Sequence, residues 1–244
     1  MAARLRTRNA LLNELPAPTR DRFIEHAELL TLNPGAVLQE PNARPPFAYF
    51  PEDGLASVVA VMEDGSMVEA ASIGRDGFLG VPLLLNTRST TRVIWQVPGA
   101  ALRIPAGAFI ELARDPVVTE VLLESIQDMM DQMAQVAGCN RRHSLVRRAA
   151  RWLLMTHDRV DGDRFVLTQE FLATMLGAGR PKVTVAAQHL QSAGLIAYRR
   201  GTVEVRDREG LERAACDCYG ILAQIYPGRA TERPKLAGVD AAAR

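Results

Sequence analysis

Residues 168–205 restrict the fold more than any other part of the sequence, because two helix patterns, a glycine-rich turn and a hairpin pattern follow one another there. Thr168 is a favourable N-cap, and Gly177-Ala178-Gly179 makes a tight turn between the helices. This order of elements is that of a winged helix-turn-helix. We expect the helices over residues 168–176 and 180–192 and the hairpin strands over residues 196–199 and 202–205.

The second predicted helix has two different faces when its residues are plotted at 3.6 per turn. Val183, Ala187 and Leu190 share an apolar face that packs inward. The opposite face carries hydrogen-bond donors, and residues 180–192 contain no Asp or Glu, which suits a surface between two phosphate chains. Arg pairs with guanine, Gln pairs with adenine, and methyl groups of Thr or Val contact thymine. The predicted base-reading residues are Arg180, Pro181, Thr184, Val185 and Gln188.

Other polar side chains near this helix are predicted to hold the DNA backbone. Free N–H groups at a helix start bind phosphate, and arginines at a hairpin tip reach the neighbouring backbone as charges. The alternative is an ordinary helical hairpin with a solvated arginine face. The predicted backbone contacts are Thr168, Gln169, Lys182, Arg199 and Arg200.

The distribution of charge also points to a polyanionic partner, although the net charge of the whole chain is only +1. Residues 1–138 contain 11 basic and 17 acidic residues, whereas residues 139–208 contain 13 basic and 6 acidic residues. An acidic first half joined to a basic block favours binding to nucleic acid. A solvated basic surface without a partner is the alternative.

The first half of the chain has a β pattern. Between residues 31 and 110, turn signals such as Asp64-Gly65 and Pro98-Gly99 separate short segments rich in Val, Ile, Leu and Ala. Many short strands between such turns predict an all-β sandwich, barrel or roll. Residues 61–68 are predicted to form a hairpin by themselves.

A long helix is predicted after Asp115-Pro116, where Asp serves as N-cap and Pro fits the first turn. Apolar residues then step by 4, 3, 4 and 3 positions, which is the spacing of a two-stranded coiled coil. Packing of the same stripe onto its own domain is the alternative, and homodimerisation is the preferred interpretation. The predicted dimer interface is Leu122, Ile126, Met129, Met133 and Val136.

Composition and cysteine content exclude several classes of protein. No apolar run approaches the roughly 20 residues of a membrane span, and the N-terminus lacks the apolar core of a signal peptide, so we expect a cytoplasmic protein without membrane contact. Cys139, Cys216 and Cys218 are too few for a disulfide framework or for the four thiolates of an iron–sulfur cluster. We expect no metal and interpret Cys216 and Cys218 as structural thiols. A metal contact by this Cys-x-Cys pair is the alternative.

The sequence resembles a known family over about residues 10–226, most specifically in residues 165–205. The segments FVLTQEFLATMLG (residues 165–177), RPKVT (residues 180–184) and LQSAGLIAYRRG (residues 190–201) are similar to the Crp/Fnr family, named for the cyclic-AMP receptor protein and the fumarate–nitrate regulator. The resemblance implies a homodimer on a two-fold symmetric site in double-stranded DNA, with RNA polymerase as a further partner. It implies that Arg180 corresponds to the arginine with which family members chiefly read the bases. Pro181 departs from the Glu of several members, so the operator sequence does not transfer.

The resemblance also implies a β-roll whose ligand, when there is one, changes the orientation of the dimer helix. Members that bind cyclic AMP carry a Gly-Glu pair and, further on, Arg-Ser or Arg-Thr for the phosphate. Here Val81 stands in place of the glutamate that binds ribose, and either Arg88-Ser89 or Ser89-Thr90 aligns with the phosphate-binding pair. The candidate effector pocket is Gly80, Val81, Arg88, Ser89 and Thr90.

No cofactor is expected, and a cyclic nucleotide is the alternative ligand. An iron–sulfur cluster of this family would need N-terminal cysteines, which are absent from the sequence. Haem held by a histidine of the roll is excluded because residues 28–142 contain no His.

We therefore expect an α+β chain with a cyclic-nucleotide-binding-like β-roll (a double-stranded jelly roll), a long dimerisation helix and a C-terminal winged helix-turn-helix. A final helix from Glu209 to about Tyr226, capped by Asp207, is expected to close the DNA-binding domain. The expected parts are a helical entry at 1–30, the roll at 31–114, the dimerisation helix at 115–139, the DNA-binding domain at 140–226 and a disordered tail at 227–244.

The expected function is a sequence-specific DNA-binding transcription regulator that does not bind cyclic AMP in the usual way. One alternative is a regulator that responds to a cyclic nucleotide through an altered phosphate pocket. Another is a nucleotide-binding sensor whose effect is not transcriptional. A cupin-like enzyme would need several His ligands and a carboxylate in the roll, and the roll has no His. No catalytic residue is expected.

Overall fold

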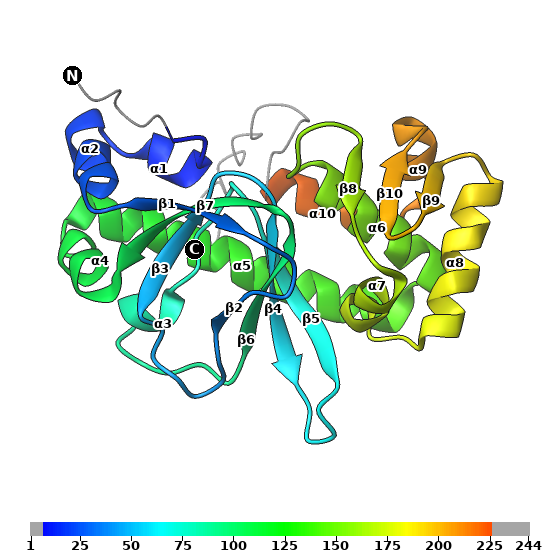
Figure 1. The fold of residues 1–244 in the computed structure, drawn as a ribbon, viewed down its shortest axis with the longest axis horizontal. Helices are drawn as coiled ribbons and strands as arrows, with labels where there is room; N and C mark the ends of the chain where they lie inside the picture. The colour runs from blue at the N-terminus through cyan, green and yellow to red at the C-terminus, as the bar shows by residue number, and fades with distance from the viewer. Residues whose placement is uncertain (1–6, 226–244) are drawn as a thin grey trace, which may run out of the picture.

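The computed structural model describes residues 7–225 and arranges them as a β-roll and a helical domain joined by one long helix (Figure 1). The chain begins with α1 (Ala10–Glu14) and α2 (Ala17–Glu25), which lie at the far end of the roll from the helical domain. The long helix, α5 (Pro116–Arg142), runs along the roll and reaches the helical domain. The tail predicted at 227–244 lies outside the described residues.

The roll consists of two antiparallel sheets, with strand orders β1-β7-β3 and β2-β6-β4-β5. Most neighbours in these sheets are distant in sequence, as expected for a roll rather than a simple meander. The predicted β architecture is confirmed, although the first strand begins at residue 28 instead of 31. Its elements are β1 (Glu28–Leu32), β2 (Val37–Gln39), β3 (Phe47–Pro51), β4 (Leu55–Val61), β5 (Met67–Ile73), α3 (Val81–Leu84), β6 (Arg92–Val97), β7 (Gly99–Pro105) and α4 (Ala106–Leu112).

The predicted hairpin at residues 61–68 is confirmed as the tip of β4 and β5. The Ser66 carbonyl accepts a hydrogen bond from the Met62 N–H at 2.8 Å, which closes the turn. Gly65 has a φ of +79°, in the left-handed region that favours glycine. The short-range signal Asp64-Gly65 was therefore sufficient to locate this turn.

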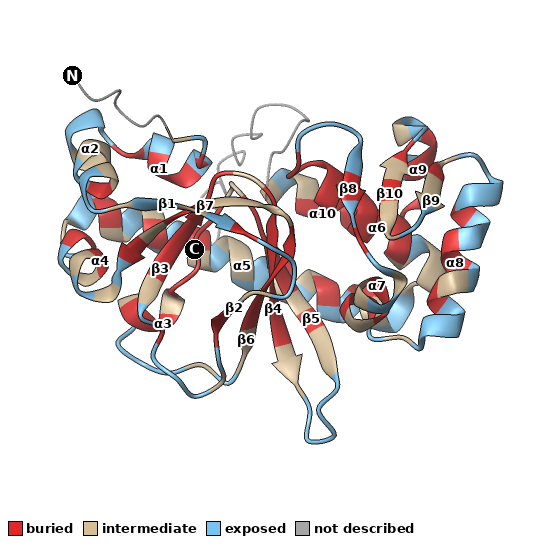
Figure 2. Cartoon of the chain, in the orientation of Figure 1, coloured by how far each residue is buried: buried red, intermediate tan, exposed pale blue. Residues whose placement is uncertain are grey.

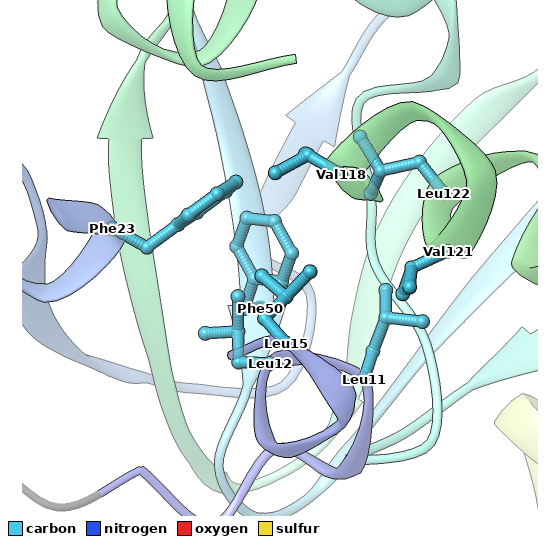
Figure 3. A pocket seen from close by; sticks show the side chains of 8 residues that line it. All are labelled: Leu11, Leu12, Leu15, Phe23, Phe50, Val118, Val121 and Leu122. Carbon is cyan, nitrogen blue, oxygen red and sulfur yellow. The ribbon is translucent and has the colours of Figure 1, made fainter. Parts of the chain in front are cut away.

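Aromatic packing fixes α1, α2 and the start of α5 to one end of the roll (Figure 3). Phe50 of β3 is fully buried, and the rings of Phe23 and Phe78 have their centroids 5.6 and 5.9 Å from its own. Such edge-to-face and stacked arrangements are favourable for aromatic pairs. Val118 and Leu122 of α5 reach the same cluster from another side (Figure 3). The first two turns of α5 are consequently part of the core of the roll.

The long helix begins where the sequence predicted and ends later. Asp115 caps it by accepting a hydrogen bond from the Val117 N–H at 3.1 Å, and Pro116 occupies the first turn. The helix continues to Arg142 instead of ending at residue 139. It passes through Gly138, because Cys139 beyond it is buried where α5 contacts α10 (Cys218–Ile225). Packing thus outweighs the low helix propensity of a single glycine.

The helical domain is a winged helix-turn-helix, as predicted. Its strands pair in the order β8-β10-β9. The single final helix predicted from residue 209 is wrong: the backbone becomes extended at Ala215, with ψ of 168°, and two helices replace it. Asp207 nevertheless caps the first of them, as expected. The elements are α6 (Leu145–His157), β8 (Arg164–Val166), α7 (Gln169–Leu176), α8 (Arg180–Ser192), β9 (Ile196–Arg199), β10 (Thr202–Val205), α9 (Arg208–Ala214) and α10 (Cys218–Ile225).

The helical domain packs against the roll through α6 and α7, and α6 and much of β4 are buried (red in Figure 2). The indole N–H of Trp152 donates a hydrogen bond to Glu69 Oε1 at 2.8 Å, and the Ser57 hydroxyl donates to the other carboxylate oxygen. Arg159 pairs with Asp76 at 2.8 Å. Burial raises the pKa of Glu69 above its ordinary value, and the two donated hydrogen bonds oppose this shift.

We expect Glu69→Gln to change the pH dependence of stability. Because the folded-state pKa of Glu69 is raised, its protonated form favours folding, and this contribution is complete below the ordinary pKa and is lost as pH rises through the folded-state value. The amide stays neutral throughout, so the variant should gain stability relative to the wild type as pH rises from the ordinary glutamate pKa of about 4.5 through the folded-state pKa of Glu69. Urea denaturation across this range measures the difference. The exposed Glu63→Gln is the control and should follow the wild type; an identical profile for Glu69→Gln would contradict the assignment.

Candidate functional site

The turn between α7 and α8 is fixed by local capping and by the roll. The Thr168 hydroxyl accepts a hydrogen bond from the Phe171 N–H at 3.1 Å, which caps α7. Gly177 ends α7 with a φ of +56°. A Cβ at this glycine would lie 3.2 Å from the side chain of Val68 in β5, so the turn also approaches the roll closely. These contacts set the direction in which α8 starts.

The helix α8 has the two faces that the sequence predicted. Val183, Ala187 and Leu190 are buried, and Ala186 joins them. Val185 is 64% exposed, although it is a branched apolar residue. The exposed positions of this helix are Arg180, Pro181, Lys182, Val185, Gln188, His189, Gln191 and Ser192. Four of the five residues predicted to read bases are thus accessible on one side of the domain, where α8 lies at the edge of the molecule (Figure 1).

The fifth predicted residue, Thr184 of α8, is partly buried, and its side chain bonds to α7. Its hydroxyl donates to the side-chain oxygen of Gln169 at 2.8 Å, with the carbonyl of Arg180 as the other acceptor at 3.0 Å. Thr184 and Gln169, which were predicted to contact DNA separately, are therefore hydrogen-bonded to each other. The methyl group of Thr184 stays available for apolar contact, and the Gln169 amide nitrogen stays available as a donor.

The wing is a two-residue hairpin whose tip is Arg200-Gly201. Both residues have positive φ, of 49° and 75°, which is the conformation of a type I′ turn. An arginine in this region is uncommon. The strand β9 is anchored by the Tyr198 hydroxyl, which donates to the carbonyl of Leu167 at 2.8 Å, and burial raises the pKa of Tyr198 to about 12. Arg199 and Arg200 are both exposed at the tip.

The cations at the start of α8 and at the wing tip are not neutralised by the chain. Among residues 7–225, no carboxylate forms an ion pair with Arg180, Lys182, Arg199 or Arg200. By contrast, Arg164 and Arg206 at the base of the wing share Glu204, at 2.9 and 3.1 Å. Within the described residues, the positive charges at the start of α8 and at the wing tip therefore have no carboxylate partner.

The stripe predicted as the dimer interface faces its own chain. Leu122 is only 2% exposed and belongs to the core of the roll, and Val136 is also buried. Met129 and Met133 pack against the sheets, and Ile126 packs against the aromatic core. Packing within one chain buries the side chains of Leu122 and Val136, and a role of this stripe in a dimer stays a prediction. The alternative use of such a stripe, packing onto its own domain, is the one that the structure shows.

A cavity of about 320 Å³ lies inside the roll and is closed on one side by α5. Met129 and Met133 form that wall, and Phe78, Val58 and Val93 supply much of the rest. Four of the five residues predicted for the effector pocket line it: Gly80, Val81, Arg88 and Ser89. Thr90 is exposed and is not part of the lining.

The polar groups of this cavity are few. Sequence reasoning missed Gln39 and Thr91, whose side chains also line it; the amide of Gln39 donates to the Thr91 carbonyl at 3.2 Å. Arg88 donates to the Asn42 carbonyl at 3.1 Å. No Asp or Glu is among the lining residues within the described chain. The cavity offers an arginine, an amide and hydroxyls in a largely apolar surface.

Three cysteines and a histidine that are far apart in sequence meet at the end of α5. The ligating atoms of Cys139, His143, Cys216 and Cys218 all lie within 4.8 Å of one another. The hydrogen bond between the two thiols lowers the pKa of Cys139, and the same bond together with burial raises the pKa of Cys216. The convergence of these four residues was not predicted from the sequence. The signal was the spacing of Cys139 and His143, which puts both on one face of a helix.

No helix in the described part of the chain combines the length and the apolar character that crossing a membrane requires.

Two family models match the sequence. The model of the Crp-like helix-turn-helix domain matches residues 147–214, and the model of the cyclic nucleotide-binding domain matches residues 29–115. Together the two matches cover more than half of the chain. No curated protein matches the chain.

Solved structures of regulators from several bacteria share this fold. FixK2 from Bradyrhizobium japonicum is 15% identical, with a TM-score of 0.65 over 78% of this chain and 98% of its own. A CRP/FNR-family transcriptional regulator from Thermus thermophilus is 21% identical, with a TM-score of 0.62 over 77% and 98%. The c-di-GMP-responsive global regulator CLP from Xanthomonas campestris is 16% identical, with a TM-score of 0.60 over 78% and 99%.

The two domain matches agree with the two parts of the structure. The cyclic nucleotide-binding domain corresponds to the roll with its cavity, and the helix-turn-helix domain corresponds to α6 through α9. The long helix α5 joins them. The chain belongs to the Crp/Fnr family of transcriptional regulators.

Proposed function

We propose that this regulator binds a two-fold symmetric site in double-stranded DNA as a homodimer, with α8 of each protomer in a major groove. The observation that carries the proposal is the outer face of α8. Arg180 and Gln188 are exposed there with Val185, while the opposite face of the same helix is buried. No acidic residue interrupts residues 180–192, so the helix can lie between two phosphate chains without repulsion.

We assign direct base reading to Arg180, Gln188 and Val185, and backbone contact to the surrounding charges. Arg180 offers the bidentate fork that fits guanine. Lys182, Arg199 and Arg200 have no carboxylate partner in residues 7–225 and supply charge for phosphates. Thr184 and Gln169 act together, since their hydrogen bond positions the start of α8 relative to α7. Thr168 and Pro181 complete the surface at the two helix starts.

We place the dimer contact on the outer face of α5. Leu123 and Met130 are 48% and 56% exposed there, although both are apolar. Leu123, Gln127, Met130 and Ala134 are all exposed and step by 4, 3 and 4 positions, which is the spacing of a coiled-coil seam. The inner face of the same helix is already used by the roll, so the outer face is the one available to a second copy.

We propose that the roll responds to an effector, and that this effector is not cyclic AMP bound in the way usual for the family. Val81 supplies no carboxylate for a ribose, and a buried ribose hydroxyl without a partner would lose a hydrogen bond. A largely apolar ligand with one anionic group fits the cavity better, with Arg88 near its mouth. A cyclic nucleotide held by Arg88 and Ser89 alone is the second candidate, and contact with RNA polymerase follows from the same family role.

Arg180→Ala should remove sequence preference at one base position per half-site. Loss of a bidentate contact costs about 1–3 kcal/mol against the preferred base and little against the others. Sites are first selected from random-sequence DNA by the wild type, and binding to single-base variants of the selected site is then measured. Arg44→Ala, an exposed arginine of the roll, is the control. Equal weakening on every sequence would reject a base-reading role for Arg180.

Arg200→Asn should lower affinity for all DNA sequences and reduce its salt dependence. Asparagine tolerates the left-handed conformation, so the turn is kept while the charge is lost. The slope of log affinity against log salt should fall by about 1 per protomer. Arg200→Lys keeps the charge and should retain the slope. A slope unchanged by the asparagine would show that the wing tip does not touch the backbone.

Met130→Glu should convert a dimer into monomers, because it introduces a negative charge beside Asp131 in the proposed seam. Sedimentation equilibrium of the full chain measures the dissociation constant, and we expect it to rise at least about tenfold, or roughly 1.4 kcal/mol. Met62→Glu, at the exposed tip of the β4–β5 hairpin, is the matched control. An unchanged dissociation constant for Met130→Glu would show that the dimer contact does not include Met130.

A further inference from the structure

Four potential metal ligands converge where the two domains join. Cys139 lies in the last turns of α5, and His143 is the residue that ends this helix. Cys216 lies in the break between α9 and α10, and Cys218 begins α10. Two segments separated by more than seventy residues therefore contribute two residues each.

The distances fit one ion and not a cluster. The Sγ atoms of Cys139 and Cys216 are 3.5 Å apart, and Cys218 Sγ lies 3.5 Å from His143 Nδ1. Two sulfurs bound tetrahedrally to one zinc ion at about 2.3 Å would lie about 3.8 Å apart. All four ligating atoms lie within 4.8 Å of one another. Iron–sulfur clusters distribute their ligands over several irons and use four thiolates, or two thiolates with two histidines.

The histidine is held in the orientation that a ligand needs. Its Nε2 lies 3.1 Å from the Asp217 carboxylate. A proton on Nε2 would bond to this carboxylate and leave the lone pair of Nδ1 directed at Cys218. A carboxylate behind the histidine is the usual second partner in protein metal sites, where it fixes the ring and raises its basicity.

The surroundings also match a site with one net negative charge. The three cysteines form a buried cluster of their own, separate from the apolar clusters. Arg151, whose charge acts on both Cys139 and Glu69, is 3% exposed; its Nε has no hydrogen-bond partner in the described chain, and no carboxylate there lies within ion-pair distance of it. Three thiolates, one neutral imidazole and one divalent ion carry a charge of about −1 in total. Such a site would supply the counter-charge that a buried arginine requires.

We propose that Cys139, His143, Cys216 and Cys218 bind one tetrahedral zinc ion that joins the end of α5 to α10. Binding forms three Zn–S bonds and one Zn–N bond, and the three thiol protons pass to solvent without any change of oxidation state. All four positions are protein ligands, so the site is closed and structural. It would fix His143, where the chain turns from α5 into α6, and so the position of the helical domain on the long helix. The proposal does not depend on DNA binding.

The first test is metal analysis of the full chain, purified without a histidine tag under reducing conditions. We expect one zinc per chain after extensive dialysis. Cobalt added to the metal-free protein should give the intense visible bands of tetrahedral coordination and a sulfur-to-cobalt charge-transfer band. Absence of metal, octahedral cobalt spectra, or two or more irons per chain would each overturn the proposal.

The second test separates metal binding from folding. Asp217→Asn changes an exposed side chain, so the fold should be retained while zinc affinity, measured by competition with a chelating dye, falls about 10- to 100-fold. His143→Gln should abolish the tetrahedral cobalt spectrum. His26→Gln, which changes an exposed histidine at the C-terminal end of α2, is the control and should bind as the wild type does. Zinc at roughly a thousandfold excess over its dissociation constant should raise the melting temperature of the protein by roughly 10 °C. An unchanged melting temperature would count against the site. An equal zinc affinity in Asp217→Asn and the wild type would also count against it.

Discussion

The packing of α5 against the β-roll is the contact on which the rest of the structure depends. Along its length, the helix contacts three different parts of the molecule. Leu122 closes the aromatic core, Met129 and Met133 form one wall of the cavity, and Cys139 meets the C-terminal helix. Because one rigid helix makes all of these contacts, a displacement at one of them must be transmitted to the others or be absorbed by bending.

This arrangement gives the cavity a direct mechanical connection to the DNA-binding domain. A ligand in the cavity would touch Met129 and Met133, whose flexible side chains adapt to different contents. The helical domain in turn rests on the roll through Trp152 and Glu69, and on the end of α5 through the cysteine cluster. Two interfaces therefore set the position of α8, and an effector need only favour one arrangement of α5 over another.

The helix-turn-helix was predictable because its signals are local. Thr168 caps α7 through a neighbour three residues away, Gly177 supplies a left-handed turn, and the faces of α8 follow from a period of 3.6 residues. The β4–β5 hairpin was predictable for the same reason. The break between α9 and α10 was missed, because Ala215 carries no breaking signal and its extended backbone follows from packing around the cysteines.

The sequence by itself determined the order of the elements, the inner and outer faces of α8, the arginines at its start and at the wing tip, and the absence of a glutamate beside Gly80. Each of these depends on residues that are adjacent or one helical turn apart. Only the tertiary structure decided which face of α5 is buried against the roll and that Cys139 and His143 meet Cys216 and Cys218. The heptad spacing of Leu122 and Val136 is the same whether the partner is a second helix or the chain's own roll. Contacts between distant segments depend on how the two domains pack, and no short-range pattern records that packing.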